Sequence, residues 1–95
     1  MNFVRTCEEF MKEVRIFRPD AYFRTREIPS GSKFIDIHFK GVNKELVFEL
    51  TASNEIYGSV LDSSDPTVRL FDGHDREFES LEEAKQYAVL ESQKL

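Results

Sequence analysis

The sequence predicts a single α+β domain over residues 1–95, with a helix near each end and a five-stranded antiparallel meander sheet between them. Three observations predict this fold class. Apolar residues recur at helical spacing in two segments, apolar and polar residues alternate with the period of a strand between them, and turn-forming residues separate the alternating runs. Both helices are expected to pack mainly on one face of the sheet, because a domain of this size needs its sheet covered.

Composition agrees with a globular protein. Hydrophobic residues make up 40% of the chain and charged residues 33%, which is an ordinary balance for a folded domain. Cys7 is the only cysteine, so an internal disulfide is excluded and a reducing compartment is favoured. The start, MNFVRTCEEF, lacks the apolar stretch of a signal peptide, and no run approaches the ~18 apolar residues of a membrane helix. We therefore expect a cytoplasmic protein with no membrane contact.

The spacing predicts a first helix from Thr6 to about Arg18. Thr6 and Glu9 have the form of a capping box, in which a hydroxyl residue is followed three positions later by glutamate. One apolar stripe follows at helical spacing: Cys7, Phe10, Met11, Val14 and Phe17. Pro19 disfavours helical geometry at Arg18, which sets the expected end of the helix.

Three strands follow, at Asp20–Glu27 and as a hairpin within Lys33–Leu50, whose turn contains Gly41 and Asn43. Matching charges and apolar groups sets the register. The first pair is expected to place Glu27 opposite Lys33, Thr25 opposite Ile35, Arg24 opposite Asp36, Phe23 opposite Ile37, Tyr22 opposite His38 and Ala21 opposite Phe39. The second pair is expected to place Ile35 opposite Leu50, Ile37 opposite Phe48, Phe39 opposite Leu46 and Lys40 opposite Glu45.

The C-terminal half supplies two more strands and a helix. Glu55–Leu61 is predicted to be the fourth strand, with Gly58 marking a bulge or a close packing contact. Thr67–Phe71 is predicted to be the fifth, followed by a turn at Asp72 and Gly73. Ser80 and Glu83 form a second capping box, opening a helix from Leu81 to about Ser92. Its expected buried stripe is Leu81, Ala84, Tyr87, Ala88 and Leu95, with Phe78 packed over its start.

The predicted sheet has two different faces. Its core face carries Ala21, Phe23, Ile35, Ile37, Phe39, Leu46, Phe48 and Leu50. Its second face, here called the polar face, carries Tyr22, Arg24, Arg26, Phe34, Asp36, His38, Val47, Glu49 and Thr51. Tyr57, Leu61 and Phe71 also fall on this face. Two other arrangements would explain those apolar residues, namely one helix on each face, or a homodimer that covers this side.

Charge is unevenly distributed along the chain. The net charge is −5, but residues 1–44 carry +3 and residues 45–95 carry −8. The acidic flank, over residues 62–83, contributes six candidate partner-binding carboxylates: Asp62, Asp65, Asp72, Asp75, Glu77 and Glu79. Such a surface can steer a basic partner into contact, and it also keeps a small protein soluble. We expect a non-catalytic protein-binding module of the inhibitor, immunity or regulatory type. Its size and acidity are similar to those of many small bacterial or phage-encoded binding proteins, although no motif carries that likeness.

The polar face suggests a second function. Tyr22, Arg24, Arg26, Phe34, Asp36 and His38 lie together on it, and single-stranded nucleic acid is bound by aromatic platforms with basic rims. Asp36 and Glu49 on the same face, together with the negative net charge, oppose phosphate binding. The polar face is also expected to serve a protein partner.

An enzyme is the third hypothesis. Cys7 would be the nucleophile if it lay in the first turn of its helix, where the dipole lowers a thiol pKa. His38 with Asp36 would be a general base, although no nucleophile is predicted beside them. Asp72, His74 and Asp75 group metal-ligand types in a turn, but their spacing matches no zinc or EF-hand pattern and Asp-Gly is usual turn chemistry. No cofactor or metal is expected.

Overall fold

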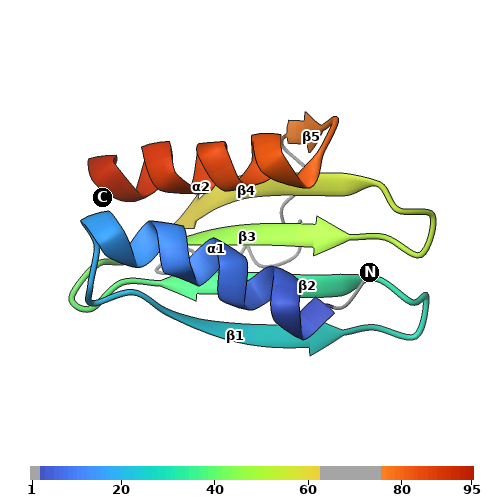
Figure 1. Ribbon diagram of the computed structural model, residues 1–95. Helices are drawn as coiled ribbons and strands as arrows, with labels where there is room; N and C mark the ends of the chain where they lie inside the picture. Colours follow the sequence, from blue (N-terminus) through green and yellow to red (C-terminus); the bar gives the residue numbers. More distant parts are fainter. Residues whose placement is uncertain (1–2, 63–75) are drawn as a thin grey trace.

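The fold class predicted from the sequence is confirmed by the computed structural model, which describes residues 3–62 and 76–95. In these residues the elements follow in the order α1 (Phe3–Phe17), β1 (Tyr22–Glu27), β2 (Lys33–His38), β3 (Lys44–Leu50), β4 (Ile56–Asp62), β5 (Arg76–Phe78) and α2 (Leu81–Lys94). All neighbouring strands are antiparallel and lie in sequence order, as in a meander. The two helices lie side by side on one face of the sheet and run in the same direction (Figure 1).

The first helix starts earlier than its sequence pattern suggests. The prediction that Thr6 caps α1 is wrong, because the helix begins at Phe3 and Thr6 is buried within it. Phe3 packs against the core, and this contact extends the helix by about one turn beyond the capping-box pattern. The buried stripe ends at Val14, since Phe17 is 51% exposed. The predicted end of the helix, just before Pro19, is confirmed.

The register between β1 and β2 is the predicted one at every pair from Tyr22–His38 to Glu27–Lys33. The register between β2 and β3 differs from the prediction by two residues. Ile37 lies opposite Leu46 and Ile35 opposite Phe48, while Glu45 lies opposite His38 and not Lys40. The reason is that the turn between β2 and β3 is longer than the predicted one. The chain turns at Phe39, whose carbonyl accepts a bond from Val42 N, and Gly41 adopts a φ of +74° there. An even shift preserves which side chains share a face.

The fourth strand is regular and its glycine is a packing contact. β4 pairs with β3 without interruption, so Gly58 does not form a bulge. A Cβ atom at Gly58 would lie 2.8 Å from atoms of both the Phe48 and Phe78 rings. Gly58 therefore provides the space in which two core aromatic rings approach the β4 backbone.

The fifth described strand, β5, precedes α2 directly and contains Phe78, which was expected only to pack over the helix start. The predicted strand Thr67–Phe71 and the predicted turn at Asp72 and Gly73 lie outside the described residues. Ser80 is confirmed as the N-cap of α2, because its side-chain oxygen accepts a bond from Glu83 N at 3.2 Å. The carboxylate of Glu83 accepts from Glu79 N at 3.4 Å, which completes the helix start.

One hydrophobic core joins the helices to the sheet. It includes buried residues from α1, from β2, β3 and β4, and from α2, and its largest fully buried side chains are Phe10 and Phe48. Leu81, Tyr87 and Leu95 pack against it, as the predicted stripe of the second helix requires. Within the described residues, both helices cover the core face and the polar face carries no helix (Figure 1). No described helix is long and apolar enough to span a membrane.

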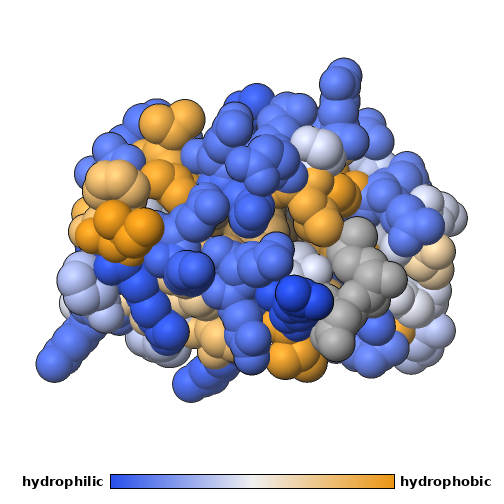
Figure 2. Space-filling view, viewed as in Figure 1, coloured by the Kyte–Doolittle hydropathy of each residue, from blue (hydrophilic) through white to orange (hydrophobic). Residues whose placement is uncertain are grey.

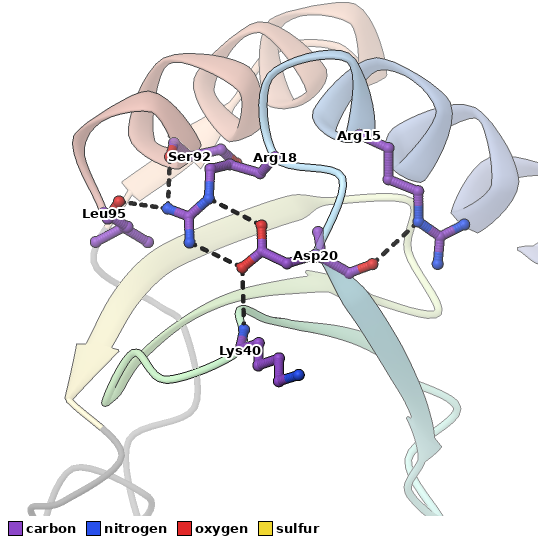
Figure 3. A network of polar contacts seen from close by, with 7 residues as sticks. Arg15, Arg18, Asp20, Lys40, Ser92 and Leu95 are labelled. Carbon is purple, nitrogen blue, oxygen red and sulfur yellow. Dashed lines mark hydrogen bonds and ion pairs between the residues drawn. The ribbon is translucent and has the colours of Figure 1, made fainter.

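A network around Arg18 joins the C-terminal ends of both helices to the sheet (Figure 3). The Arg18 guanidinium donates two hydrogen bonds to the Asp20 carboxylate, at 3.1 and 3.0 Å, and donates to the carbonyl oxygens of Ser92 and Leu95. Asp20 also accepts from Lys40 N at 3.1 Å. Its hydrogen bonds with Arg18 hold the pKa of the Asp20 carboxyl below its ordinary value. Arg18 therefore supplies donors to the otherwise unsatisfied carbonyls at the end of α2.

The outer surface of the helices is mainly hydrophilic. Figure 2 shows hydrophobic residues on this side only as separate spots among hydrophilic ones. The exposed large apolar residues of α1 and α2 are Val4, Ile16, Phe17 and Leu90. Scattered residues of this kind are normal on a soluble surface, and they do not mark a docking face by themselves.

Candidate protein-binding surfaces

The polar face brings together the residues predicted for it. Strand pairing aligns them in rows across the sheet, because residues directly opposite each other in antiparallel strands share a face. The first three rows are Tyr22, His38 and Glu45; then Arg24, Asp36 and Val47; then Arg26, Phe34 and Glu49. Glu49 is in turn opposite Tyr57, and Tyr57 is opposite Glu77 in β5.

Arg26 is held by its neighbours on this face. Its guanidinium donates to both Asp36 oxygens, at 2.8 and 3.1 Å, and lies 4.5 Å from the centroid of the Phe34 ring. The Phe34 ring is only 2% exposed and packs with Val47 and Leu61 in a small second hydrophobic cluster. Arg26, Asp36 and Phe34 are adjacent as predicted, but the buried ring of Phe34 is not open for a base to stack on.

His38 lies between an aromatic ring and a carboxylate. Its ring stacks on Tyr22, with centroids 5.2 Å apart and planes 18° apart, and its Nε2 atom lies 3.3 Å from Glu45 Oε2. Asp36, the partner expected for a catalytic pair, is engaged with Arg26. Sequence reasoning missed Glu45 because the predicted register placed it beside Lys40.

A polar hollow of about 370 Å³ opens on this face. The described residues that line it are Arg24, Thr25, Arg26, Asp36, His38, Glu45, Val47 and Leu61. None of them supplies a thiol, and the only hydroxyl residue among them, Thr25, alternates to the opposite face of the sheet from Arg24 and Arg26. The hollow thus offers charged and hydrogen-bonding groups for recognition, together with a histidine–carboxylate pair.

Cys7 has the environment of an inert core residue. It is 1% exposed, and burial raises the pKa of its thiol to about 11. Because α1 begins at Phe3, Cys7 does not lie in the first turn, so the helix dipole argument for a reactive thiolate does not apply. The nearby Glu8 carboxylate further disfavours the thiolate.

Three glutamates surround the hydroxyl of Tyr57 at the β5 side of the sheet. The Tyr57 hydroxyl donates to Glu55 Oε2 at 2.8 Å, and strand pairing places Glu49 and Glu77 on either side. The Glu55 hydrogen bond, followed by desolvation and the charges of Glu77 and Glu49, raises the pKa of Tyr57 to about 12. We call Tyr57, Glu49, Glu55 and Glu77 the tyrosine–glutamate cluster. Sequence patterns did not predict this cluster, because its four residues come from three separated segments.

The raised pKa of Tyr57 predicts a measurable titration. Absorbance difference spectra between wild type and Tyr57→Phe should show this phenol ionising near pH 12 and not near its ordinary value of 10. Glu55→Gln should lower that midpoint, since the first cause of the shift is the bond to a carboxylate. The stabilisation of the protonated phenol is fully present below pH 10 and is lost as the pH rises towards 12. An unchanged midpoint in Glu55→Gln would contradict the assigned cause.

Half of the predicted acidic flank lies in the described residues. Asp62 is exposed at the end of β4, and Glu77 and Glu79 are exposed in and just after β5. Asp65, Asp72 and Asp75 lie outside the described residues, as does the candidate metal cluster of Asp72, His74 and Asp75. In the part of the chain that is described, no group of three or more histidine, cysteine or acidic residues is placed to hold a metal ion.

Comparison of the chain with protein-family models, with curated proteins and with solved structures finds no match. Inference about function therefore depends on the charges and contacts of the surfaces described above.

Proposed function

We propose that this protein is a non-catalytic binding module, of the inhibitor, immunity or regulatory type, that engages a basic protein partner. The observation that carries the proposal is the tyrosine–glutamate cluster. Its three carboxylates come from β3, from the residue preceding β4 and from β5, and together they raise the pKa of Tyr57. The hydrogen bond to Glu55 is the largest cause of this shift, and the charges of Glu77 and Glu49 add to it, so acidic groups are concentrated at this place on the sheet.

One neighbouring acid adds to the cluster, since exposed Glu79 follows β5 directly. Exposed Asp62 lies at the other end of β4, opposite Lys44. Residues 45–95 carry a net charge of −8, so the potential extends beyond one cluster. A surface of this kind accelerates encounter with a basic partner and disfavours acidic ones, which gives both rate and specificity.

The contacts on the polar face favour a protein partner over nucleic acid. A base-stacking platform needs several open rings and available cations. Phe34 is buried and Arg26 is bound to Asp36, which leaves Tyr22 as the open ring and Arg24 as the available cation among the predicted residues. The buried carboxylates of Asp36, Glu45 and Glu49 on the same face would also repel phosphate. A catalytic role for Cys7 is disfavoured by the burial and the raised pKa of its thiol.

The test is a charge reversal with a matched control. Partners captured on the wild-type protein from its native host are identified by mass spectrometry and produced in pure form. Each partner is then titrated against wild type, against Glu77→Lys/Glu79→Lys and against Glu8→Lys/Glu9→Lys. Both pairs are exposed and change charge equally, but the second pair lies on α1. We expect at least about tenfold weaker binding for the first variant alone, because it loses complementarity with the partner.

Salt provides the second readout. Affinity of the wild type should fall as ionic strength rises, since the Debye length is about 10 Å at 0.1 M salt. Equal affinity of every captured partner for the two double variants would refute the proposal that this surface binds a basic protein.

A further inference from the structure

The strand at the opposite edge of the sheet, β1, is exposed on both of its faces. It has one neighbour in the described sheet, β2, and five of its six residues are exposed, with only Phe23 partly covered. Large apolar side chains are exposed at both ends of the strand, with Tyr22 at 45% and Ile28 at 39%. A strand edge of this kind is a template for another chain unless it is blocked.

The main-chain groups that point outward can be derived from the hydrogen-bond alternation. Ile28 N donates to Ser32 O at 3.1 Å, so Ile28 faces β2. In an antiparallel pair, successive residues face alternately towards and away from the partner strand. The N–H and C=O groups of Phe23, Thr25 and Glu27 therefore face away from the sheet. The same alternation turns Ala21 outward, and there Arg15 Nε donates to its carbonyl at 3.0 Å (Figure 3).

The free edge is therefore bounded. Arg15 occupies it at Ala21, and a turn closes it after Glu27, where Gly31 N donates to Ile28 O at 2.9 Å. Between these limits, three residues present donors and acceptors that have no main-chain partner among residues 3–62 and 76–95. That length suits a short extended segment that forms main-chain hydrogen bonds along β1.

The edge carries two arginines and one exposed acid, Glu27, at its end. Arg24 and Arg26 point to the polar face, and Arg26 is paired with Asp36. Arg24 is exposed, lines the polar hollow and makes no hydrogen bond or ion pair within the described residues. A cation in this position favours an acidic side chain on an added strand, directly opposite it across the new pair.

A second copy of the chain fits this edge poorly. Two identical strands related by a twofold axis normal to the sheet pair residues of the same face. A symmetric pair centred on Thr25 would place Arg24 opposite Arg26 of the other copy. Centring it on Arg24 or on Arg26 would place two identical arginines opposite each other. Like charges directly opposite are destabilising, so these three registers are disfavoured. A pair centred on Phe23 avoids them, but there Arg15 already occupies the outward carbonyl of Ala21.

We propose that the free edge of β1 binds an extended acidic segment of a partner protein as a sixth strand. An acidic side chain of that segment faces Arg24, and an apolar side chain two positions away packs on exposed Tyr22. Main-chain bonds to Phe23, Thr25 and Glu27 supply affinity, and the alternating side chains supply specificity. β1 and β5 are opposite edges of the sheet, so this site is independent of the surface proposed for a basic partner.

The first test blocks the main-chain bonds. The probe is a short fluorescent peptide titrated by anisotropy, in which one glutamate and one valine stand two positions apart and all other residues are threonine, so that both side chains lie on the same strand face. It is called the glutamate–valine peptide. Thr25→Pro removes an outward N–H without removing a bond to β2, and proline is tolerated on edge strands in this orientation. We expect binding at least about tenfold weaker than for wild type and for the control Thr25→Ala. Amide exchange should slow at Phe23, Thr25 and Glu27 when the peptide binds to wild type.

A second arm keeps the test decisive if Thr25→Pro does not fold. The same peptide, N-methylated at alternate residues, cannot bond to a strand edge with its modified groups. We expect it to bind wild type at least about tenfold more weakly than the unmodified peptide. Equal affinity of the two peptides, or equal affinity of wild type and folded Thr25→Pro, would overturn strand addition.

A third arm tests the charge. Arg24→Glu should weaken the glutamate–valine peptide by about tenfold and strengthen a lysine–valine peptide, while Lys12→Glu on α1 should change neither. Absence of wild-type binding to the glutamate–valine peptide would overturn the proposal. So would tighter binding of a single-stranded oligonucleotide that is weakened by Arg24→Glu and unaffected by Thr25→Pro, because it would show an ionic site and not a strand edge.

Discussion

Replacement of Phe48 by alanine is expected to lower the free energy of unfolding by about 3–5 kcal/mol, the usual cost of removing a buried phenylalanine. The Phe48 ring is fully buried at the centre of the core. It contacts the ring of Phe10 from α1 at 5.1 Å, that of Phe78 from β5 at 5.9 Å and that of Tyr87 from α2 at 6.2 Å, between centroids. Removal of the ring leaves a cavity between α1, β5 and α2, and these elements cannot all move inward to fill it.

Denaturant titration followed by circular dichroism measures this loss. Since a small domain has a total stability of roughly 5–15 kcal/mol, this loss is a large fraction of the total and should shift the unfolding midpoint to clearly lower denaturant concentration. Phe17→Ala is the matched control, because Phe17 is half exposed at the end of α1 and should cost less than about 1 kcal/mol. Equal losses in the two variants would show that Phe48 is not the centre of the core.

Replacement of Gly58 by valine should cost about 3 kcal/mol, through overpacking and not through a cavity. The added Cβ would lie 2.8 Å from ring atoms of Phe48 and Phe78, closer than real Cβ contacts allow. The rings can move away only by disturbing the packing between β4 and β5. The measurement is again the free energy of unfolding from denaturant titration.

Gly41→Ala separates this effect from the general cost of replacing glycine. Gly41 has a φ of +74° and open space around its Cβ position, so alanine there should cost about 1–2 kcal/mol from backbone strain alone. A Gly58→Ala/Phe78→Leu double variant should lose less stability than the two single variants combined, because the smaller side chain relieves the clash. Strict additivity would contradict a steric cause.

The register of β1 with β2 could be predicted because two independent patterns required it. Apolar residues and opposite charges both matched in one alignment, including Arg24 with Asp36. The register of β2 with β3 could not be predicted in the same way, since a shift of two residues leaves every side chain on the same face. Hydrophobic alternation does not distinguish registers that differ by an even number. Only the length of the turn after Phe39 decides between them.

Because alternation predicts faces but not registers, only part of the binding surfaces could be predicted from the sequence. The residues of the polar face were correctly grouped, because grouping depends only on alternation. The predicted partner of His38, Asp36, was wrong, and Glu45 lies beside His38 instead, because cross-strand partners depend on register. The tyrosine–glutamate cluster depends on two further registers, with β4 and β5, and no local pattern encodes them. The Thr6 capping box failed for a different reason, since the packing of Phe3 extended the helix past a local signal.

The hydrogen bonds of Arg18 bear on the order in which contacts form during folding. Arg18 donates to main-chain oxygens 74 and 77 positions later in the chain. Contacts between such distant positions close late in folding, because the loop entropy must first be offset by nearer contacts. During synthesis, the Arg18 guanidinium therefore gains its acceptors on α2 only after the chain has been made as far as Leu95.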